Sequence, residues 1–480
     1  MMEKKKEIGL TVKKEGDFSD WYTQLMQKAE LIEYSDVSGC YTLRPRAYSI
    51  WENVQKFFDD LIKKDGVKNA YFPLLIPEKL LNKEKEHVEG FSPEVAWVTH
   101  AGGSELNERL AIRPTSETIM YDNYSKWIRS WRDLPLKLNQ WCNVVRWEFK
   151  HGVPFLRSRE FLWQEGHCAF ATKEECEKET LKILNFYARV FEELYSIPVI
   201  KGRKSGNEKF PGADVSLSVE TFLPNGKAIQ GATSHNLGQN FSEPFDIKFL
   251  DKEEKEKYVW QNSWGISTRS IGIMIMMHGD DKGLVLPPRI AEEKAVIVPI
   301  LFDKGKEKIL KKCEELSKKL KKYNVILDDR EEYSPGWKFN EWELKGIPIR
   351  IELGPKDLEK KQVVLVRRDN GKKEFIKINN IDKKIKDTLE DIQKNLFKNA
   401  KKVLEESIKV IKSKDEFNNA LENKKLIKMR WCDDRVCEAK IKEETGAKCI
   451  TIPFEQEKIS GNCPYCGKKS RVWAYFGKSY

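Results

Sequence analysis

Residues 136–170 alternate apolar and polar side chains with aromatic residues among them, and a charged stretch from Lys150 to Ser158 interrupts the alternation. A repeat of two is typical of a half-buried β-strand. Two such segments around a polar tip predict a β-hairpin with a long tip. Because the strands of a hairpin pair antiparallel, we expect an antiparallel sheet in this part of the chain.

Helices are expected before and after this hairpin. Residues 46–64 place apolar side chains on one helix face, namely Ile50, Trp51, Val54, Phe57, Phe58, Leu61 and Ile62. Gly66 ends that helix, and the pattern of residues 173–195 predicts another. An extended segment is expected over Ala70–Pro77, and strand-rich regions over 213–249 and 258–278. The first 290 residues therefore predict an α+β arrangement.

The composition changes near Pro287 and Pro288. A Lys-rich helix is expected over 304–323, with Ile309, Leu310, Cys313, Leu316, Leu320 and Tyr323 facing inward. Apolar strands are expected at Ala295–Leu301, Val325–Leu327 and Val363–Val366. This order predicts an α/β domain with a largely parallel sheet. Residues 382–428 are strongly charged and are predicted to be mostly helical.

The length of 480 residues suggests about three domains. We expect them at 1–287, 288–400 and 401–480. The charge is unevenly placed, because residues 291–480 hold 45 basic and 33 acidic residues, whereas residues 1–290 hold 41 and 42. A basic half favours contact with a polyanion. Lys-rich, solvated helices would give the same charge.

Composition also bounds the protein class. The 14 Trp, 23 Phe and 15 Tyr exclude a disordered chain. No apolar run approaches the roughly 20 residues that cross a bilayer. The longest, Ile271–Met277, has the length of a core strand. No apolar signal segment follows the charged start, so we expect a cytoplasmic protein without membrane contact. Ten cysteines in such a chain do not predict a disulfide framework.

The usual nucleotide-binding loops are absent from the sequence, as are the G-x-S-x-G and H-E-x-x-H motifs. The hairpin offers another way to bind a nucleotide. Arg146 and Glu148 are two residues apart and would face the same side of a strand. Such an arginine can bind a phosphate or a carboxylate in bidentate fashion. Phe161 on the return strand offers a face for a base, although a surface hairpin with cross-strand ion pairs fits the R-x-E pattern as well.

Three segments, in order, resemble the signature motifs of the class II aminoacyl-tRNA synthetases. Residues 46–64 followed by Tyr71-Phe72-Pro73 resemble motif 1, a long helix leading to a strand. The second motif is matched by Arg146, Glu148, Arg157 and Phe161. Residues 264–269 resemble motif 3, a strand whose final arginine opens a helix, with one glycine of the usual set.

Four further strings resemble the prolyl-tRNA synthetases of the archaeal/eukaryotic type: residues 113–117, 161–167, 230–235 and 278–288. The resemblance covers residues 17–480. It implies an α+β fold, in which a class II catalytic domain with an antiparallel sheet precedes an α/β anticodon-binding domain and a small α/β zinc-binding domain.

The resemblance implies two neighbouring binding sites. The proline site would comprise Thr115, Glu117, Arg146, Trp163, Glu165, His167, Phe210 and His235. The ATP site would comprise Arg146, Glu148, Arg157, Phe161, Gln230, Thr233 and Arg269, with Mg²⁺ on the phosphates. Arg146 and Arg269 are the expected catalytic residues: the charge of Arg146 would stabilise the transition state, and Arg269 would sandwich the adenine with Phe161. Taken singly, His167, His235 and Trp163 would each fit a core position.

In the second domain, Glu343, Arg350 and Lys356 are the candidates for reading a UGG anticodon, since such side chains discriminate the edges of unstacked bases. A salt-bridge network on a sheet face is the alternative. Near the C-terminus, Cys432, Cys437, Cys463 and Cys466 form two close pairs that suit tetrahedral, structural Zn²⁺; metal-free thiols are the alternative. The resemblance also implies that the tail ending in Tyr480 reaches back toward the active site.

The sequence thus resembles a homodimeric enzyme that activates L-proline with ATP, releases pyrophosphate, and transfers proline to the 3′ end of tRNA(Pro). Only about a hundred residues separate the hairpin from motif 3, which leaves no room for the editing insertion of the bacterial type. Some activation of alanine is therefore expected, since a pocket cannot strongly exclude a smaller apolar side chain. The alternatives are another class II synthetase, threonyl-like, or an inactive tRNA-binding paralogue.

Overall fold

The computed structural model describes residues 9–87, 94–148, 152–302 and 305–480. Its central feature is the hairpin of β7 (Leu136–Val145) and β8 (Glu160–Phe170), which pair antiparallel from Leu136↔Ala169 to Val145↔Glu160. The predicted hairpin is confirmed. The part of its charged tip at 149–151 lies outside the described residues.

This hairpin belongs to an 11-stranded sheet with the order β20-β21-β23-β22-β9-β10-β11-β14-β8-β7-β3. The strands from the first 290 residues, besides the hairpin, are β3 (Lys68–Asn69), β9 (Ile200–Arg203), β10 (Val215–Phe222), β11 (Ala228–Gly238) and β14 (Trp260–Ser267). From β9 to β7 every neighbouring pair is antiparallel. The α+β prediction is therefore confirmed.

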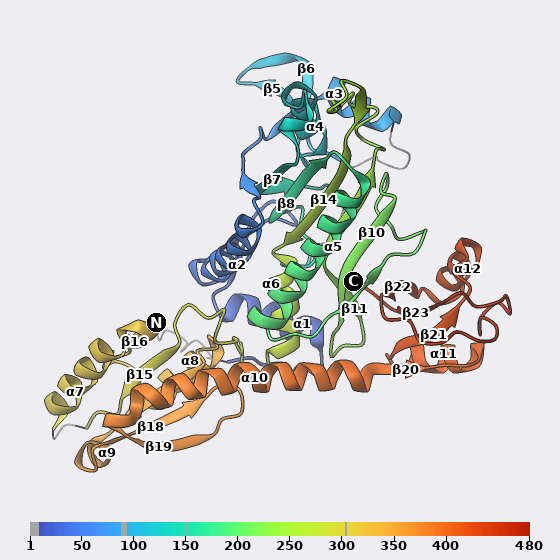
Figure 1. Cartoon of the computed structure of the whole chain (residues 1–480). Helices are drawn as coiled ribbons and strands as arrows, with labels where there is room; N and C mark the ends of the chain where they lie inside the picture. Colours follow the sequence, from blue (N-terminus) through green and yellow to red (C-terminus); the bar gives the residue numbers. More distant parts are fainter. Residues whose placement is uncertain (1–8, 88–93, 149–151, 303–304) are drawn as a thin grey trace.

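Three helices pack against this sheet: α2 (Pro45–Lys64), α5 (Lys173–Arg189) and α6 (Arg269–His278) (Figure 1). Aromatic rings fill the space between them, and Phe58 of α2 stacks on Tyr187 of α5 at 4.8 Å between ring centroids. The helices predicted over 46–64 and 173–195 are confirmed, and a short π-helix, η2 (Val190–Leu194), extends the second.

One part of the secondary-structure prediction is wrong. Residues 258–278 were expected to be strand-rich, and Ile271–Met277 to have the length of a core strand. The strand β14 ends at Ser267, and the apolar run forms α6. Every residue from Ser270 to Met277 is buried. A helix that is buried on all sides shows no amphipathic period, so its sequence cannot be told from that of a buried strand.

The other elements of this region surround the sheet. Before the hairpin they are α1 (Phe18–Lys28), β1 (Ile32–Tyr34), β2 (Tyr41–Leu43), β4 (Leu75–Pro77), α3 (Glu78–His87), β5 (Trp97–Ala101), β6 (Ser104–Ile112), α4 (Glu117–Trp127) and the 3₁₀ turn η1 (Trp131–Asp133). After it, β12 (Lys248–Leu250) pairs with β13 (Glu256–Tyr258). In a second apolar cluster, Tyr121 and Tyr124 of α4 pack with Phe241 and Phe245 of the segment that follows β11.

The second region is a five-stranded sheet with the order β16-β15-β17-β18-β19. Its strands are β15 (Ala295–Pro299), β16 (Val325–Leu327), β17 (Ile349–Leu353), β18 (Gln362–Arg367) and β19 (Lys373–Lys377). Its helices are α7 (Lys306–Lys319), α8 (Pro335–Leu344) and α9 (Pro355–Glu359), with 3₁₀ turns η3 (Lys321–Tyr323) and η4 (Ile378–Asn380).

The prediction that this sheet is largely parallel is wrong, because it is mixed. β15 is parallel to β16 and β17, whereas β17–β18 and β18–β19 are antiparallel. The connections explain the difference. A parallel crossover needs a dozen residues or more, and only residues 354–361 join β17 to β18.

A long helix, α10 (Ile381–Ser407), spans 27 residues or about 40 Å. It runs from the five-stranded sheet past the larger sheet to the C-terminal region (Figure 1). Gln393 fixes its middle, donating to the carbonyls of Glu193 and Leu194 at 2.9 and 3.2 Å. The predicted helical character of 382–428 is confirmed, and the proposed domain boundary at 400 falls inside α10.

The C-terminal region contributes strands to the larger sheet. It contains β20 (Ile408–Val410), α11 (Lys414–Glu422), β21 (Leu426–Trp431), α12 (Arg435–Thr445), β22 (Lys448–Pro453) and β23 (Val472–Gly477). β22 pairs with β9 at Ile452↔Arg203 and Pro453↔Gly202. At Gly202 an added Cβ would lie 2.3 Å from the carbonyl oxygen of Ile452, so only glycine permits this approach.

Gly166 offers a test of the packing beneath the sheet. It pairs with Trp264 across β8 and β14, and an added Cβ would lie 2.2 Å from the indole ring. We expect Gly166→Ala to destabilise the fold by roughly 1–3 kcal/mol through overpacking, which differential scanning calorimetry would register as a lower unfolding midpoint. Gly103→Ala is the control, because nothing lies within 4 Å of its added Cβ. Equal midpoints for both variants would contradict the packing.

Candidate active site

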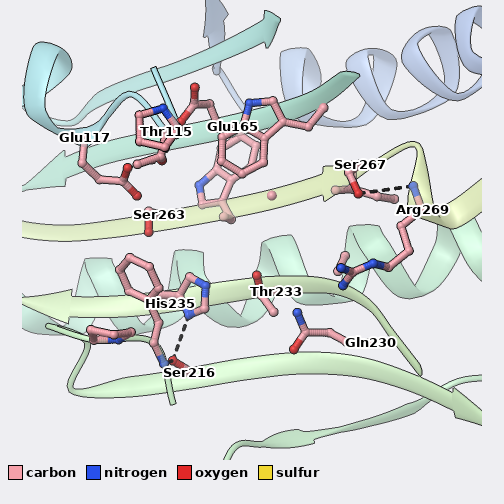
Figure 2. Close-up of a pocket in the computed structure, with 18 of the residues that line it drawn as sticks. Thr115, Glu117, Glu165, Ser216, Gln230, Thr233, His235, Ser263, Ser267 and Arg269 are labelled. Atoms are coloured by element: carbon pink, nitrogen blue, oxygen red, sulfur yellow. Dashed lines mark hydrogen bonds between the residues drawn. The ribbon is translucent and has the colours of Figure 1, made fainter. Parts of the chain in front are cut away.

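A cavity of about 480 Å³ opens on the face of the larger sheet (Figure 2). Four side chains of β8 line it at every second position: Phe161, Trp163, Glu165 and His167. This is the period of a strand, so one face of the hairpin supplies one wall. On β14, five consecutive residues, from Ser263 to Ser267, line the cavity.

The opposite wall depends on an irregularity in β11. Thr233 and His235 share a face by alternation, but Gln230 would point to the other side. The register with β10 shifts between Val219 and Glu220, which leaves Gly231 as an extra residue. A bulge of this kind re-aims the side chain beside it, and Gln230, Thr233 and His235 all line the cavity. An added Cβ at Gly231 would lie 2.4 Å from the ring of Phe191.

Positive charge gathers at one end of the cavity. Arg146 follows the end of β7, and its Nε donates to the carbonyl of Pro114 at 3.0 Å. Its guanidinium lies 5.6 Å from the ring centroid of Phe161 and 5.2 Å from that of Trp163. Arg269 opens α6, and its Nε donates to the carbonyl of Leu156. Among the described residues, neither arginine has a carboxylate within salt-bridge distance.

The electrostatics of Arg269 reflect this crowding. Burial lowers the pKa of Arg269, and the positive charges of Arg146 and Arg157 lower it further, although the negative charge of Glu220 acts the other way. Because a guanidinium stays protonated in proteins, the strain of like charges remains until an anion binds. This end of the cavity therefore suits a phosphate chain or a carboxylate.

The other end carries buried carboxylates. Glu117, the first residue of α4, accepts a hydrogen bond from the hydroxyl of Thr115. Glu165 accepts from the backbone N–H and the hydroxyl of Ser116, and it lies 3.1 Å from Nε2 of His167. Burial raises the pKa of Glu165, but hydrogen bonds from His167 and Ser116 outweigh this effect and lower it. The hydrogen bond between Glu165 and His167 also raises the pKa of His167. The hydrogen-bonded Glu165 and His167 thus support the wall behind Thr115 and Glu117.

The ligand atoms of Glu117, Glu165 and His167 lie within 4.8 Å of one another. Hydrogen bonds already occupy them, since Tyr121 lies 3.0 Å from Nδ1 of His167 and Ser116 binds both oxygens of Glu165. These hydrogen bonds hold the carboxylates of Glu117 and Glu165 in place, where their oxygens can accept a hydrogen bond from a cationic group. These buried acceptors suit a cationic group of a ligand.

An apolar wall joins the two ends. The ring of Phe210 stacks on His235 at 4.8 Å between centroids, and Nδ1 of His235 lies 2.9 Å from the hydroxyl of Ser216. The same hydroxyl accepts from the backbone N–H of Phe210. Burial lowers the pKa of His235 to about 3. A neutral imidazole stacked on Phe210 gives a flat surface for a small apolar ring.

The structure brings the predicted residues together. Of the proline and ATP candidates, all but Arg157 line the cavity, and Glu148 lies there at the exposed rim beyond the end of β7. Arg157 lies close enough for its charge to act on Arg269. The sequence analysis missed Ser216, Lys204 and Glu208, which also line the cavity. No local pattern marks these three; Ser216 joins the site through its pairing with His235 across β10 and β11, which the structure shows.

Two of the three anticodon candidates lie together. Glu343 and Arg350 line a small hollow with Arg367 and Arg368, and Arg350 binds Glu343 and Glu352 at 3.0 and 2.9 Å. The guanidinium of Arg350 also lies 4.1 Å from the ring centroid of Phe339. Lys356 is exposed on α9 and does not line this hollow.

The four cysteine sulfurs Cys432, Cys437, Cys463 and Cys466 all lie within 4.8 Å of one another, and those of Cys432 and Cys466 are 3.5 Å apart. Four sulfurs at 2.3 Å from one zinc ion would be about 3.8 Å apart. The hairpin Cys463–Lys468 closes through Gly467, whose φ of +77° favours glycine. The donor set and its spacing fit a tetrahedral Zn²⁺.

The C-terminal tail lies on the turn between β10 and β11. Ser479 pairs with Ala228, and the hydroxyl of Tyr480 accepts from Asn225 at 2.6 Å. The tail therefore reaches the larger sheet, two residues before Gln230, but Tyr480 is not among the residues that line the cavity.

Comparison with known proteins agrees with this geometry. A model of the tRNA synthetase class II core domain (G, H, P, S and T) matches residues 97–278, and a model of the anticodon binding domain matches 294–388. Together with the antiparallel sheet and its arginines, these matches define a class II aminoacyl-tRNA synthetase. Residues 414–480 match the model named prolyl-tRNA synthetase, C-terminal.

Relatives cover nearly the whole chain. The chain is 52% identical to the cytoplasmic proline–tRNA ligase of Arabidopsis thaliana, over 98% of this chain and 91% of that protein. It is 51% identical to proline–tRNA ligase 2 of Bacillus cereus, over 99% and 100%. The crystal structure of the Cryptosporidium parvum prolyl-tRNA synthetase with halofuginone and AMPPNP matches with a TM-score of 0.95 and 50% identity, over 98% and 99%. The chain belongs to the prolyl-tRNA synthetase family and is an enzyme of this type, a proline–tRNA ligase.

The low pKa of His235 predicts how its imidazole responds to acid. An unfolded histidine takes up a proton near pH 6.5, whereas folded His235 stays neutral until about pH 3. The unfolded state therefore binds more protons between these values, and His235 contributes stability that is lost as pH falls below 6.5. We expect ¹⁵N NMR to show a neutral His235 at pH 5, with the signal assigned by its absence in His235→Asn. A protonated imidazole at pH 5 would contradict the burial and the apolar wall.

Proposed function

We propose that this cavity binds L-proline and MgATP, forms prolyl-adenylate with release of pyrophosphate, and then transfers proline to the 3′ end of tRNA(Pro) with release of AMP. The observation that carries this proposal is the polarity of the cavity. Arg269 lies at one end and the buried carboxylates Glu117 and Glu165 at the other (Figure 2), and Arg146 lines the cavity with them. An amino acid with its carboxylate turned toward ATP has the same polarity.

In the first step a proline carboxylate oxygen attacks the α-phosphorus of ATP, and the bond from that phosphorus to the bridging oxygen breaks. The carboxylate is already a nucleophile, so no general base is needed and alignment supplies much of the rate. Arg146, which lies beside Phe161, would bind the attacking oxygen of proline and an oxygen of the α-phosphate together. Its fixed charge stabilises the negative charge of the transition state.

The remaining residues divide between the substrates. Thr115 and Glu117 would accept hydrogen bonds from the proline ammonium, with Glu165 and His167 holding that wall in place. Trp163, Phe210 and His235 would enclose the ring. Phe161 and Arg269 would sandwich the adenine through stacking and cation–π contact, and Gln230, Thr233 and Glu148 would hydrogen-bond the nucleotide. Arg157 would bind the γ-phosphate, and Mg²⁺ would enter with ATP as its counter-ion.

For the second step, we infer that the five-stranded sheet recognises the anticodon. Glu343 and Arg350 line one hollow and offer an acceptor and a donor for base edges. The excess of basic residues in 291–480 supports binding of the tRNA backbone. Lys356, exposed on α9, is proposed as a backbone or base contact at the edge of the same sheet.

Two further features belong to this proposal. We infer a structural Zn²⁺ at the four cysteines, which leave no open coordination position for catalysis. We also infer a homodimer, because Tyr48 of α2 and Tyr71 and Leu75 of the extended segment after it are large apolar side chains that are exposed in the single chain. No helix among the described residues could cross a membrane, and a cytoplasmic location is proposed from the named Arabidopsis relative.

ATP–pyrophosphate exchange, measured with each amino acid in turn, tests the activation step. We expect proline to support the fastest exchange without tRNA, and alanine to support a slower one. Arg146→Ala is expected to slow proline-dependent exchange by about 10²–10³. Arg350→Ala is the matched control, because it should keep exchange and weaken only tRNA charging. Exchange that is fastest with another amino acid, or unaffected by Arg146→Ala, would contradict the proposal.

Native mass spectrometry tests zinc and assembly together. We expect a dimer, at twice the 56.1 kDa of the chain, carrying one zinc per protomer. Cys463→Ser should lower the zinc content, because it removes one of four thiolates. Cys313→Ser is the control, since Cys313 lies in the core of the five-stranded region. A monomer would exclude the dimer, and a wild-type chain without zinc would exclude the metal site.

A further inference from the structure

The loop that follows β9 forms part of the cavity wall. We call residues 204–213 the pocket loop. Lys204, Glu208, Lys209, Phe210 and Pro211 from this loop line the cavity. Phe210 is the residue that stacks on His235, so the position of the loop sets the shape of the proposed proline pocket.

The pocket loop is held from outside by the cysteine-bearing region. Ser205 is fully buried, and its hydroxyl donates to Oε1 of Glu438 on α12, which is 3% exposed. Asn207 donates to the carbonyl of Arg435 at 3.0 Å. Glu208 lies 3.3 Å from Nζ of Lys448. An added Cβ at Gly206 would lie 2.5 Å from Nε of Arg435, so the backbone of the loop contacts α12 directly.

The hydrogen bonds continue from Ser205 into the pocket. The carbonyl of Ser205 accepts from the backbone N–H groups of Glu208 and Lys209, at 3.3 and 3.0 Å, which sets the turn. The next residue, Phe210, donates its N–H to Ser216, whose hydroxyl lies 2.9 Å from His235. One continuous path therefore leads from Glu438 to the apolar wall.

On its other side, Glu438 is tied to the cysteine cluster. It directly follows Cys437, and both stand in the first turn of α12. Asp434 caps that turn by accepting from the N–H groups of Val436 and Cys437. Asp434 is held in turn by Lys468, which lies 2.5 Å away in the segment after Cys466. The cysteine cluster thus holds together the two segments, around Asp434 and around Lys468, that fix the position of the first turn of α12.

We propose that Glu438 is a positioning residue for proline binding, which acts through Ser205 and couples the cysteine metal site to the pocket loop. This rests on the proposed proline and zinc sites. Loss of the metal would loosen the start of α12, release the pocket loop and weaken binding of proline. Binding of MgATP should be unaffected, because its proposed contacts do not come from the loop. Arg146 follows the end of β7, Phe161 lies on β8 and Arg269 begins α6.

The test measures binding of L-proline and of MgATP to the full-length, zinc-loaded protein by isothermal titration calorimetry. Glu438→Ala is expected to raise the Kd for proline about tenfold, since the buried hydrogen bond that holds Ser205 is removed. Glu438→Gln keeps an acceptor for Ser205 and should bind proline nearly as the wild type does. Glu443→Ala, on the exposed part of α12, is the matched control. The Kd for MgATP should stay the same in all variants.

Hydrogen–deuterium exchange of the same proteins gives a readout that does not depend on activity. We expect faster exchange of the amides of 205–210 in Glu438→Ala and in wild-type protein stripped of metal by a chelator, with β14 unchanged. Ser205→Ala should reproduce the proline effect, and the double variant should be no worse than either single one. If Glu438→Ala does not fold, Ser205→Ala and the metal-stripped protein carry the same expectations.

Two results would overturn the proposal. One is unchanged proline affinity and loop exchange in both Glu438→Ala and Ser205→Ala. The other is an equal loss of proline and MgATP affinity, which would mark a general structural role. Failure of the proposed function would give a different result, namely a wild-type protein that does not bind proline. The hydrogen–deuterium exchange of the pocket loop would still show whether the loop depends on the metal site.

Discussion

Backbone pairing within one antiparallel sheet is the constraint on which the rest of the structure depends. Strands β8, β14, β11 and β10 lie side by side, and the alternation along each directs every second side chain to one face. That face carries the cavity, while Trp264 and the aromatic rings of α2 and α5 fill the other. The bulge at Gly231 changes this alternation so that Gln230 also lines the cavity.

Charge then decides what this face can bind. Arg146 and Arg269 meet no carboxylate partner among the described residues, and burial with like charges lowers the pKa of Arg269. At the other end, Glu165 is held by Ser116 and His167, so its negative charge is retained in a buried place. Such an arrangement costs folding free energy until substrates with matching charges fill it. Sites of this kind are more typical of catalysis than of structural support.

The sequence predicted those parts of the fold and site that depend on local pattern. The hairpin, α2 and the arginines were visible because periodicity and residue spacing are properties of short segments. The apolar run of α6 was not assigned correctly, since a helix buried on all sides has no period. The mixed second sheet was missed although the short link at 354–361 was present in the sequence. Ser205 and Glu438 could not be paired at all, because 233 residues separate them.

The two appended regions contact different elements that support the cavity. The C-terminal region reaches the pocket loop and hence Phe210, on the amino acid side. The five-stranded region reaches α6, because Arg368 binds both oxygens of Asp280 at 2.6 and 2.7 Å just beyond the end of that helix. Arg368 also donates to the carbonyl of Glu343, a proposed anticodon contact. Since α6 begins with Arg269, one rigid element joins the anticodon-binding side to the nucleotide end. Each appended region is therefore attached to an element of one proposed substrate site, the pocket loop for proline and α6 for ATP.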